Sequence, residues 1–215
     1  MRLHLKASPV IPEAVQIPKL SPRQIAEGGL RRFEGRIHDR NNPDSENLNN
    51  WLLENYYMVG FGTSRDVFAL DDTYVLKVAT TKVGLSQNAV EYHVSSRYPD
   101  LPVAHVAYAA QNDLFLIVDR ARQLVPEHFE ETYGMSFEAF ADMIEEMYQG
   151  GSIYRRQKIY RQLTPQLRTL LAALQRRKIS IYDLDRKEQW GDVNDTPVIV
   201  DYGMNPGAAK DYVNP

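Results

Sequence analysis

The hydrophobic and polar positions of the chain follow different periods in its two halves. In the first half the period is close to two over residues 57–69 and 73–80, which is typical of β-strands. A helix is expected over 86–98, with Ser86 as a candidate N-cap. A second pair of strands is expected over 103–110 and 114–118.

From residue 125 onwards the spacing of apolar residues becomes helical. Gly150-Gly151 is expected to end one helix, and Thr164-Pro165 to begin another. Their buried stripes are expected to be Phe137, Phe140, Ile144 and Met147 in the first helix, and Leu167, Leu170, Leu171 and Leu174 in the second. Two short strands, 179–182 and 197–200, should flank a turn-rich stretch. The whole pattern predicts an α+β fold with a strand-rich half, a connector near 119–124 and a helical half.

The first forty residues carry four prolines and little periodicity, so an extended arm is expected there, packed on the main body or on a partner. A helix start is predicted at Asn41-Asn42-Pro43-Asp44, with Trp51 and Leu52 on one helix face.

The composition of the 215-residue chain narrows the possible functions. The net charge of −3 makes nucleic-acid binding unlikely on composition, and no apolar run reaches the length of a membrane span. The absence of cysteine excludes disulfides, thiolate metal sites and cysteine nucleophiles. The N-terminus lacks the apolar core of a secretory signal, so a cytoplasmic protein is expected.

A glycine-rich turn, Gly60-Phe61-Gly62-Thr63-Ser64-Arg65, stands between two strand-like runs. Glycines such as Gly60 and Gly62 let backbone N–H groups approach phosphate oxygens. The spacing matches G-x-G-x-x-G-x-V, except that Arg65 replaces the third glycine. The alternative is an ordinary glycine-rich hairpin. A dinucleotide-binding fingerprint is disfavoured because a strand follows where that motif has a helix.

Lys77 is flanked by apolar residues within a predicted strand. Such a lysine can lie on an exposed face, or it can point into a cleft and hold a phosphate as a point charge. A buried lysine needs an acidic partner, and Glu91, in the middle of the next helix, is the candidate. The alternative for Glu91 is a solvated surface charge.

Two aspartates follow apolar segments near the end of the chain. Asp183 comes after Ile181-Tyr182, at the start of a loop where a carboxylate can accept a hydrogen bond from an attacking hydroxyl. Asp201 follows a strand and precedes Tyr202-Gly203. Glu188 and Gln189 add oxygens that can bind magnesium beside phosphate. The alternative is a polar surface loop.

The order of these segments resembles that of the protein-kinase superfamily over residues 57–205, and it is most similar to small kinase-like proteins of phage or bacterial origin. The resemblance implies a two-lobed kinase-like fold: an antiparallel-sheet N-lobe with one helix over 51–120 and a minimal, mostly helical C-lobe over 121–215. Residues 1–50 would form the N-terminal arm and helix start.

The resemblance also implies ATP and Mg²⁺ as cofactors and a role for each candidate residue. The implied roles are phosphate covering for Gly60 and Gly62, phosphate binding for Lys77 with Glu91 as its partner, adenine contact at the hinge for Val118 and Asp119, catalysis for Asp183, and metal binding for Asp201 with Glu188 or Gln189.

The chain departs from the family pattern at several positions. Tyr182 stands where the H-R-D motif has arginine, Arg65 would crowd the phosphate loop, and neither Glu188 nor Gln189 is the family asparagine. Only residues 204–215 follow the aspartate triplet, so the usual substrate platform is expected to be absent. A protein partner or substrate would then dock against residues 1–50 or 125–160.

Two functions are compatible with these residues. One is an ATP- and Mg²⁺-dependent phosphotransferase acting on a protein or small-molecule hydroxyl. The other is a pseudokinase, a kinase-shaped binding or regulatory module without phosphoryl transfer. The enzyme interpretation requires that the Lys77 ammonium not point away from Asp201, and that apolar side chains not fill the space between Gly62 and Asp201.

Overall fold

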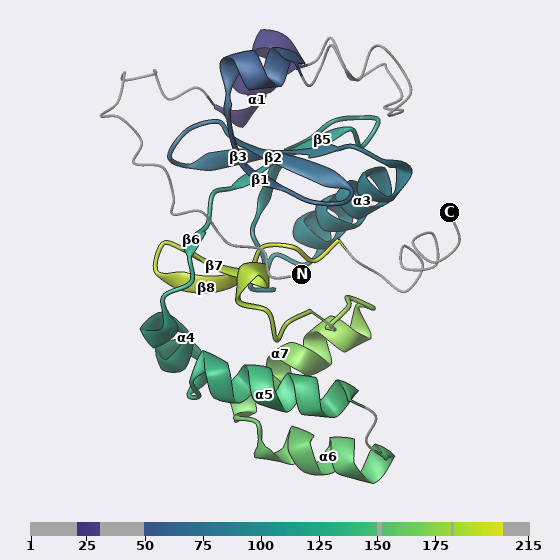
Figure 1. Ribbon diagram of the computed structural model, residues 1–215, viewed down its shortest axis with the longest axis vertical. Helices are drawn as coiled ribbons and strands as arrows, with labels where there is room; N and C mark the ends of the chain where they lie inside the picture. Colours follow the sequence, from purple (N-terminus) through teal and green to yellow (C-terminus); the bar gives the residue numbers. More distant parts are fainter. Residues whose placement is uncertain (1–20, 31–49, 150–151, 182, 204–215) are drawn as a thin grey trace.

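The computed structural model describes residues 21–30, 50–149, 152–181 and 183–203 (Figure 1). Residues 1–20 and 31–40 of the expected arm, the helix start at 41–44, the Gly150-Gly151 helix end and Tyr182 lie outside these residues. The structure confirms the predicted α+β class, because an antiparallel sheet with one long helix precedes a mostly helical part.

The larger sheet has five strands in the spatial order β1-β2-β3-β5-β4, each antiparallel to its neighbours. The strands are β1 (Tyr57–Phe61), β2 (Arg65–Ala69), β3 (Tyr74–Ala79), β4 (Val106–Ala109) and β5 (Phe115–Asp119). The predicted strand positions are therefore confirmed, with the glycine-rich turn joining β1 to β2.

One face of this sheet is covered by the N-terminal segment, which lies above it in Figure 1. The segment forms α1 (Pro22–Ile25) and one wide helical turn, η1 (Ala26–Leu30), rather than the expected extended arm. Ser21 and Gln24 cap α1 reciprocally, and Ala26 and Leu30 are fully buried against the sheet. Burial of small and apolar side chains thus fixes a segment whose sequence shows little periodicity.

The long helix α3 (Lys82–Arg97) supplies side chains to the opposite face of the sheet. Its N-cap is Thr81, which accepts a hydrogen bond from the backbone of Gly84, so the predicted Ser86 cap is wrong. A Cβ added at Gly84 would lie 2.2 Å from the carbonyl oxygen of Ser64. The close approach of the glycine-rich turn therefore requires glycine in the first turn of α3.

The helical part of the chain packs around an aromatic core. Its helices are α4 (Pro126–Tyr133), α5 (Phe137–Tyr148), α6 (Ile153–Gln162) and α7 (Pro165–Arg176). The side chains predicted for the α5 and α7 stripes are all buried, and Thr164 caps α7 as expected. Phe129 lies at the centre, with ring centroids 4.7–5.4 Å from those of Tyr133, Phe137, Phe140 and Trp190.

A small antiparallel sheet lies between the two parts in Figure 1. It contains β6 (Arg122–Gln123), β7 (Trp190–Val193) and β8 (Thr196–Ile199), and a short 3₁₀ helix, η3 (Lys187–Gln189), precedes β7. The predicted strand at 179–182 is wrong: residues 179–181 are irregular, and the partner of β8 is β7, inside the stretch expected to be turns. Among the described residues, no helix has the length and apolar content needed to cross a bilayer.

Candidate functional site

A charge cluster, formed by the buried Arg65, Lys77 and Glu91 and the partly exposed Asp201, lies where β2, β3, α3 and the segment after β8 meet. The register of the sheet pairs Arg65 with Ala79 and Val67 with Lys77. Because paired residues share a face and side chains alternate along a strand, Arg65 and Lys77 project from the same face of the sheet. Both cations therefore meet the helix that carries Glu91.

Glu91 is fully buried and is the centre of the cluster. One carboxylate oxygen, Oε2, accepts a hydrogen bond from Lys77 Nζ at 2.8 Å, and the other, Oε1, accepts one from the Arg65 guanidinium at 2.8 Å. The structure thus brings Glu91 to Lys77, as the cost of burying an unpaired lysine suggests.

Arg65 extends the cluster to Asp201. Its second terminal nitrogen donates to Asp201 Oδ1 at 2.5 Å, and its first also lies 3.4 Å from the side-chain oxygen of Asn88. The arginine side chain is only 7% exposed. Sequence reasoning treated Arg65 as an obstruction in the phosphate loop and missed this bridge between two carboxylates.

The ionisation of the cluster follows from these contacts. Burial acts to raise the pKa of Asp201, but the positive charges of Arg65 and Lys77 outweigh it and hold that pKa below its usual value. Burial acts to lower the pKa of Arg65, but Glu91 and Asp201 raise it above its usual value. Both shifts favour the charged forms, so Arg65 and Asp201 form a true ion pair at neutral pH.

The Lys77 ammonium also donates to the backbone carbonyl of Val200, the residue before Asp201. It therefore does not point away from Asp201. The side chain that the glycine-rich turn sends to Asp201 is the charged Arg65, not an apolar one. Neither condition that would exclude an enzyme is met.

Asp201 is held in place by the two residues that follow it. Tyr202 is buried and donates its hydroxyl to the carbonyl of Ala104 at 2.7 Å, and burial raises its pKa well above the usual value. A Cβ added at Gly203 would lie 2.7 Å from the carbonyl oxygen of Gln87. Only glycine fits this contact with α3, so the triplet is held between α3 and the segment that precedes β4.

A small cavity of about 30 Å³ lies beside the cluster. It is lined by Ser180, Asp183, Leu184, Gln189, Asp201 and Tyr202. The structure therefore brings Asp183 and Asp201, far apart in sequence, to one cavity about the size of a water molecule. Asp183 is half-exposed, with Arg186 Nε at 3.5 Å from its carboxylate.

The predicted magnesium ligands differ in their surroundings, and the magnesium site stays a prediction. Asp201 Oδ1 is already paired with Arg65, Gln189 lines the small cavity, and Glu188 is exposed. In the described ranges, three His, Asp or Glu side chains that could hold a metal ion together are not found anywhere. Magnesium is usually held by one or two carboxylates together with waters and substrate phosphates, so the observation that stands against it here is that Arg65 already occupies one Asp201 oxygen.

The remaining predicted residues flank the cluster. Gly60 and Gly62 lie in the β1–β2 segment, where an added Cβ would make ordinary contacts of 3.7 and 3.5 Å with Val67 and the Arg65 carbonyl. Val118, at the end of β5, is fully buried near Val198, and burial raises the pKa of the adjacent Asp119. Val118 and Val198 thus belong to one apolar cluster, which joins β5 to the small sheet.

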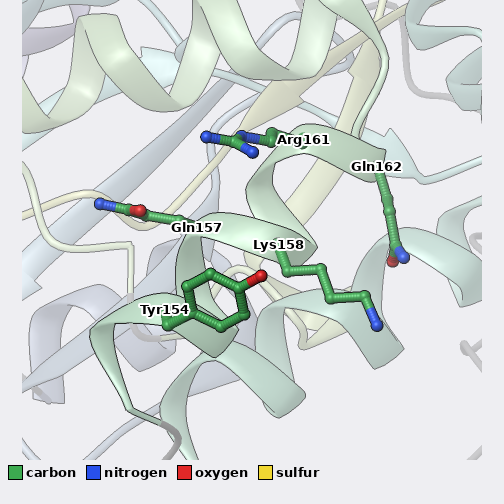
Figure 2. A pocket seen from close by; sticks show the side chains of 5 residues that line it. All are labelled: Tyr154, Gln157, Lys158, Arg161 and Gln162. Carbon is green, nitrogen blue, oxygen red and sulfur yellow. The ribbon is translucent and has the colours of Figure 1, made fainter.

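A larger hollow, about 250 Å³, lies on helix α6 and shares no residue with the charge cluster. Figure 2 shows its lining side chains, which are Tyr154, Gln157, Lys158, Arg161 and Gln162. All five belong to one exposed helix, at the end of the molecule away from the five-stranded sheet in Figure 1. Size alone therefore does not mark the chemically distinctive site.

No protein-family model matches the chain, and no curated protein matches it in sequence. Among solved structures, it is similar to the streptomycin–ATP–APH(2″)-IIa ternary complex, with a TM-score of 0.33 and 12% identity over 75% of this chain and 71% of that one. It is also similar to the GDP and kanamycin complex of APH(2″)-IIia, with a TM-score of 0.38 and 8% identity over 74% of this chain and 73% of that one. The chemistry of the site has to be inferred from its own residues.

Proposed function

We propose that the chain is an ATP-dependent phosphotransferase of kinase-like type that acts on a hydroxyl group of a protein or small molecule. The observation that carries the proposal is the buried Lys77–Glu91 ion pair at 2.8 Å, next to Asp201 and to the cavity that contains Asp183. These four side chains have the order and the proximity that a nucleotide-phosphate site requires.

Lys77 supplies the fixed positive charge for the nucleotide phosphates. An isolated buried ammonium is costly, and Glu91 offsets the cost by accepting a hydrogen bond from it. A pair made only for stability could be replaced by apolar side chains, which often stabilise a core as well or better. A lysine buried in this cluster next to Asp201 is therefore better explained by binding of an anion.

Asp183 is the group that orients the acceptor. In the transfer step, the acceptor oxygen attacks the γ-phosphorus of ATP, the bond between that phosphorus and the bridging oxygen breaks, and ADP leaves with the electron pair. The hydroxyl proton passes to the Asp183 carboxylate. Lys77 and Arg65 stabilise the negative charge on the phosphate oxygens, so the contribution of the protein is mainly positioning and electrostatics.

A second function is favoured by one specific contact. Asp201 Oδ1 accepts a hydrogen bond from Arg65 at 2.5 Å, so that oxygen already has a cationic partner within the chain. This pair supports a nucleotide-binding regulatory module without transfer, the pseudokinase alternative.

The two functions can be separated with ATP labelled at the γ-phosphate. ATP is expected to raise the melting temperature of the wild-type chain, and label is expected to reach the protein or be released as phosphate. Asp183→Asn should bind ATP equally well but lose about 10²–10⁴-fold in transfer and hydrolysis, the usual contribution of a positioned base. Asp142→Asn, at an exposed position of α5, is the matched control and should change neither.

Binding without label transfer or hydrolysis in the wild type would favour the regulatory module. Absence of any ATP-induced shift, with or without Mg²⁺, would contradict both nucleotide-dependent functions.

A further inference from the structure

We propose that the Arg65 guanidinium takes the place of a divalent metal ion at Asp201, so that a nucleoside triphosphate binds to this cluster without Mg²⁺. The inference rests on the proposed nucleotide-binding function and specifies the cation that this function uses.

The position of Arg65 in the chain supports this role. Arg65 ends the glycine-rich turn and begins β2, so the segment next to the expected phosphate position itself carries the cation. Its guanidinium reaches Glu91 at 2.8 Å and Asp201 at 2.5 Å. The planar fork of arginine suits carboxylate and phosphate oxygens, and it can be shared between them.

The backbone before Arg65 is anchored, which makes the bridge a built feature rather than a chance contact of a surface side chain. The Ser64 hydroxyl donates to Gln87 Oε1 at 2.6 Å, and the Ser64 carbonyl accepts from the backbone of Thr80 at 2.8 Å. Gly84 packs so closely on the same carbonyl that a side chain would not fit there. The turn is therefore fixed to both α3 and β3.

The charge balance disfavours an added metal ion. Arg65 and Lys77 already neutralise Glu91 and Asp201, and both cations are almost fully buried. A divalent ion on Asp201 would either displace Arg65 or stand beside it, and like charges repel strongly where water is excluded. The phosphate oxygens instead share the N–H donors of the Arg65 guanidinium with Glu91 and Asp201.

The test is the ratio of the dissociation constants for ATP measured in EDTA and in Mg²⁺, by equilibrium dialysis with radiolabelled ATP. For the wild-type chain the two constants should agree within about threefold. Arg65→Gly, which restores the third glycine of the motif, should weaken binding in EDTA by at least about tenfold, as expected for a lost hydrogen bond to a charged group, and should recover with Mg²⁺.

Two further variants control the comparison. Arg65→Lys keeps the positive charge but loses the planar guanidinium. Its ratio of dissociation constants in EDTA and Mg²⁺ should lie between the ratios of the wild type and Arg65→Gly, nearer to that of the wild type. Arg122→Gly removes an exposed arginine that pairs with Asp195 at 2.7 Å, and it should leave the ratio unchanged. Circular dichroism and thermal unfolding establish that each variant is folded.

The wild-type ratio alone can overturn the inference. If the wild-type chain binds ATP only with Mg²⁺, Arg65 does not replace the metal, whether or not the glycine variant folds. The inference is also wrong if Arg65→Gly binds ATP in EDTA as tightly as the wild type does. If the wild type binds ATP in neither buffer, the proposed function itself fails, and this result is distinct from dependence on Mg²⁺.

Discussion

The sheet half of the molecule buries paired charges beside its apolar core, whereas the core of the helical half is mainly apolar and aromatic. In the sheet half, Arg65, Lys77 and Glu91 are buried as charges and held by mutual ion pairs. In the helical half, the core is apolar and aromatic around Phe129 and Trp190. Apolar burial is the main source of stability, whereas buried ion pairs roughly offset their own desolvation. The difference indicates that the first set is retained for function and the second for folding.

Among the described residues, Asp192 is the other charged side chain that is buried, whereas the cations of helix α6 are exposed to solvent. Helix α6 carries four cations, and every one of them is exposed: Arg155, Arg156, Lys158 and Arg161. Arg155 pairs with Glu146 at 2.7 Å on the surface, where such contacts contribute little to stability. The cluster around Glu91 therefore stands out against a surface that solvates its charges in the ordinary way.

The largest loss of stability is expected from the aromatic core. Phe129→Ala should reduce the free energy of unfolding by about 5 kcal/mol, the upper end for such a substitution, because four aromatic rings surround the side chain and cannot collapse into the space together. The measurement is urea unfolding followed by circular dichroism.

If the comparison is right, the Phe129→Ala chain should still bind ATP with wild-type affinity at a temperature where it remains folded. A large loss of ATP affinity in the folded variant would show that the two halves are not separable in this way.

A smaller loss of stability, but a larger effect on binding, is expected from the charge cluster. Glu91→Gln should reduce the free energy of unfolding by about 3 kcal/mol, the lower end for breaking a buried ion pair. The loss is limited because Arg65 still has Asp201 as a partner, and Lys77 still donates to the Val200 carbonyl. ATP affinity should fall with it. Glu130→Gln, on the exposed side of α4, should stay within about 0.5 kcal/mol.

The contrast between the halves would break if Glu91→Gln proved as stable as the wild type and bound ATP normally. The pair with Lys77 would then be dispensable, and the proposed phosphate site would lose its anchor.

The Lys77–Glu91 pair could be predicted from the sequence, because it follows from the local hydrophobic pattern and from the cost of burying an unpaired lysine. Lys77 stands in an apolar strand segment and Glu91 in the following helix, and a buried lysine requires a carboxylate. The stripes of α5 and α7 were predictable for the same reason, since helical spacing is local.

The Arg65 bridge could not be predicted, because it depends on a non-local register. Arg65 reaches Glu91 only because it is paired with Ala79, two positions from Lys77 on the same sheet face. A shift of one residue would have turned it to the other face, and the sequence does not specify that register.

Strand β7 was missed because its sequence disfavours strands. Gly191 and Asp192 are poor strand formers, yet both are required here by tertiary contacts. A Cβ at Gly191 would lie 2.7 Å from the carbonyl oxygen of Arg122. The buried Asp192 carboxylate accepts from the backbone of Val125 at 2.8 Å and lies 3.0 Å from His128 Nδ1.

The cluster should make the sheet half sensitive to acid. The pKa of Asp201 is lowered in the folded chain, so its contribution is fully present above about pH 4, near the unfolded value, and is lost as pH falls through the folded value. Asp201→Asn should reduce stability at pH 7 by about 1 kcal/mol, the most expected for a pair screened by solvent, since the Asp201 side chain is 40% exposed.

Urea unfolding at pH 7 and pH 3 measures this difference. The gap between wild type and Asp201→Asn should narrow at pH 3, whereas Asp142→Asn should differ little from the wild type at both. A gap that is independent of pH would mean that the carboxylate charge does not stabilise the fold.

The aromatic core should have the opposite pH dependence, and this is the smallest expected effect. Burial raises the pKa of Tyr133 well above its usual value, so the neutral phenol favours the folded state below about pH 10, and that contribution is lost as pH rises further. At pH 7, Tyr133→Phe should change stability by less than about 1 kcal/mol, because the hydroxyl lies 3.4 Å from its acceptor, the Pro197 carbonyl.

Urea unfolding between about pH 9 and 11, on either side of the ordinary tyrosine pKa of about 10, tests this prediction. Over that range the wild type should lose stability more steeply than Tyr133→Phe. The control is Tyr154→Phe, at a residue that is 79% exposed, and it should follow the wild type. Equal slopes for wild type and Tyr133→Phe would show that the core tolerates a phenolate, and the two halves would then not differ in how they handle charge.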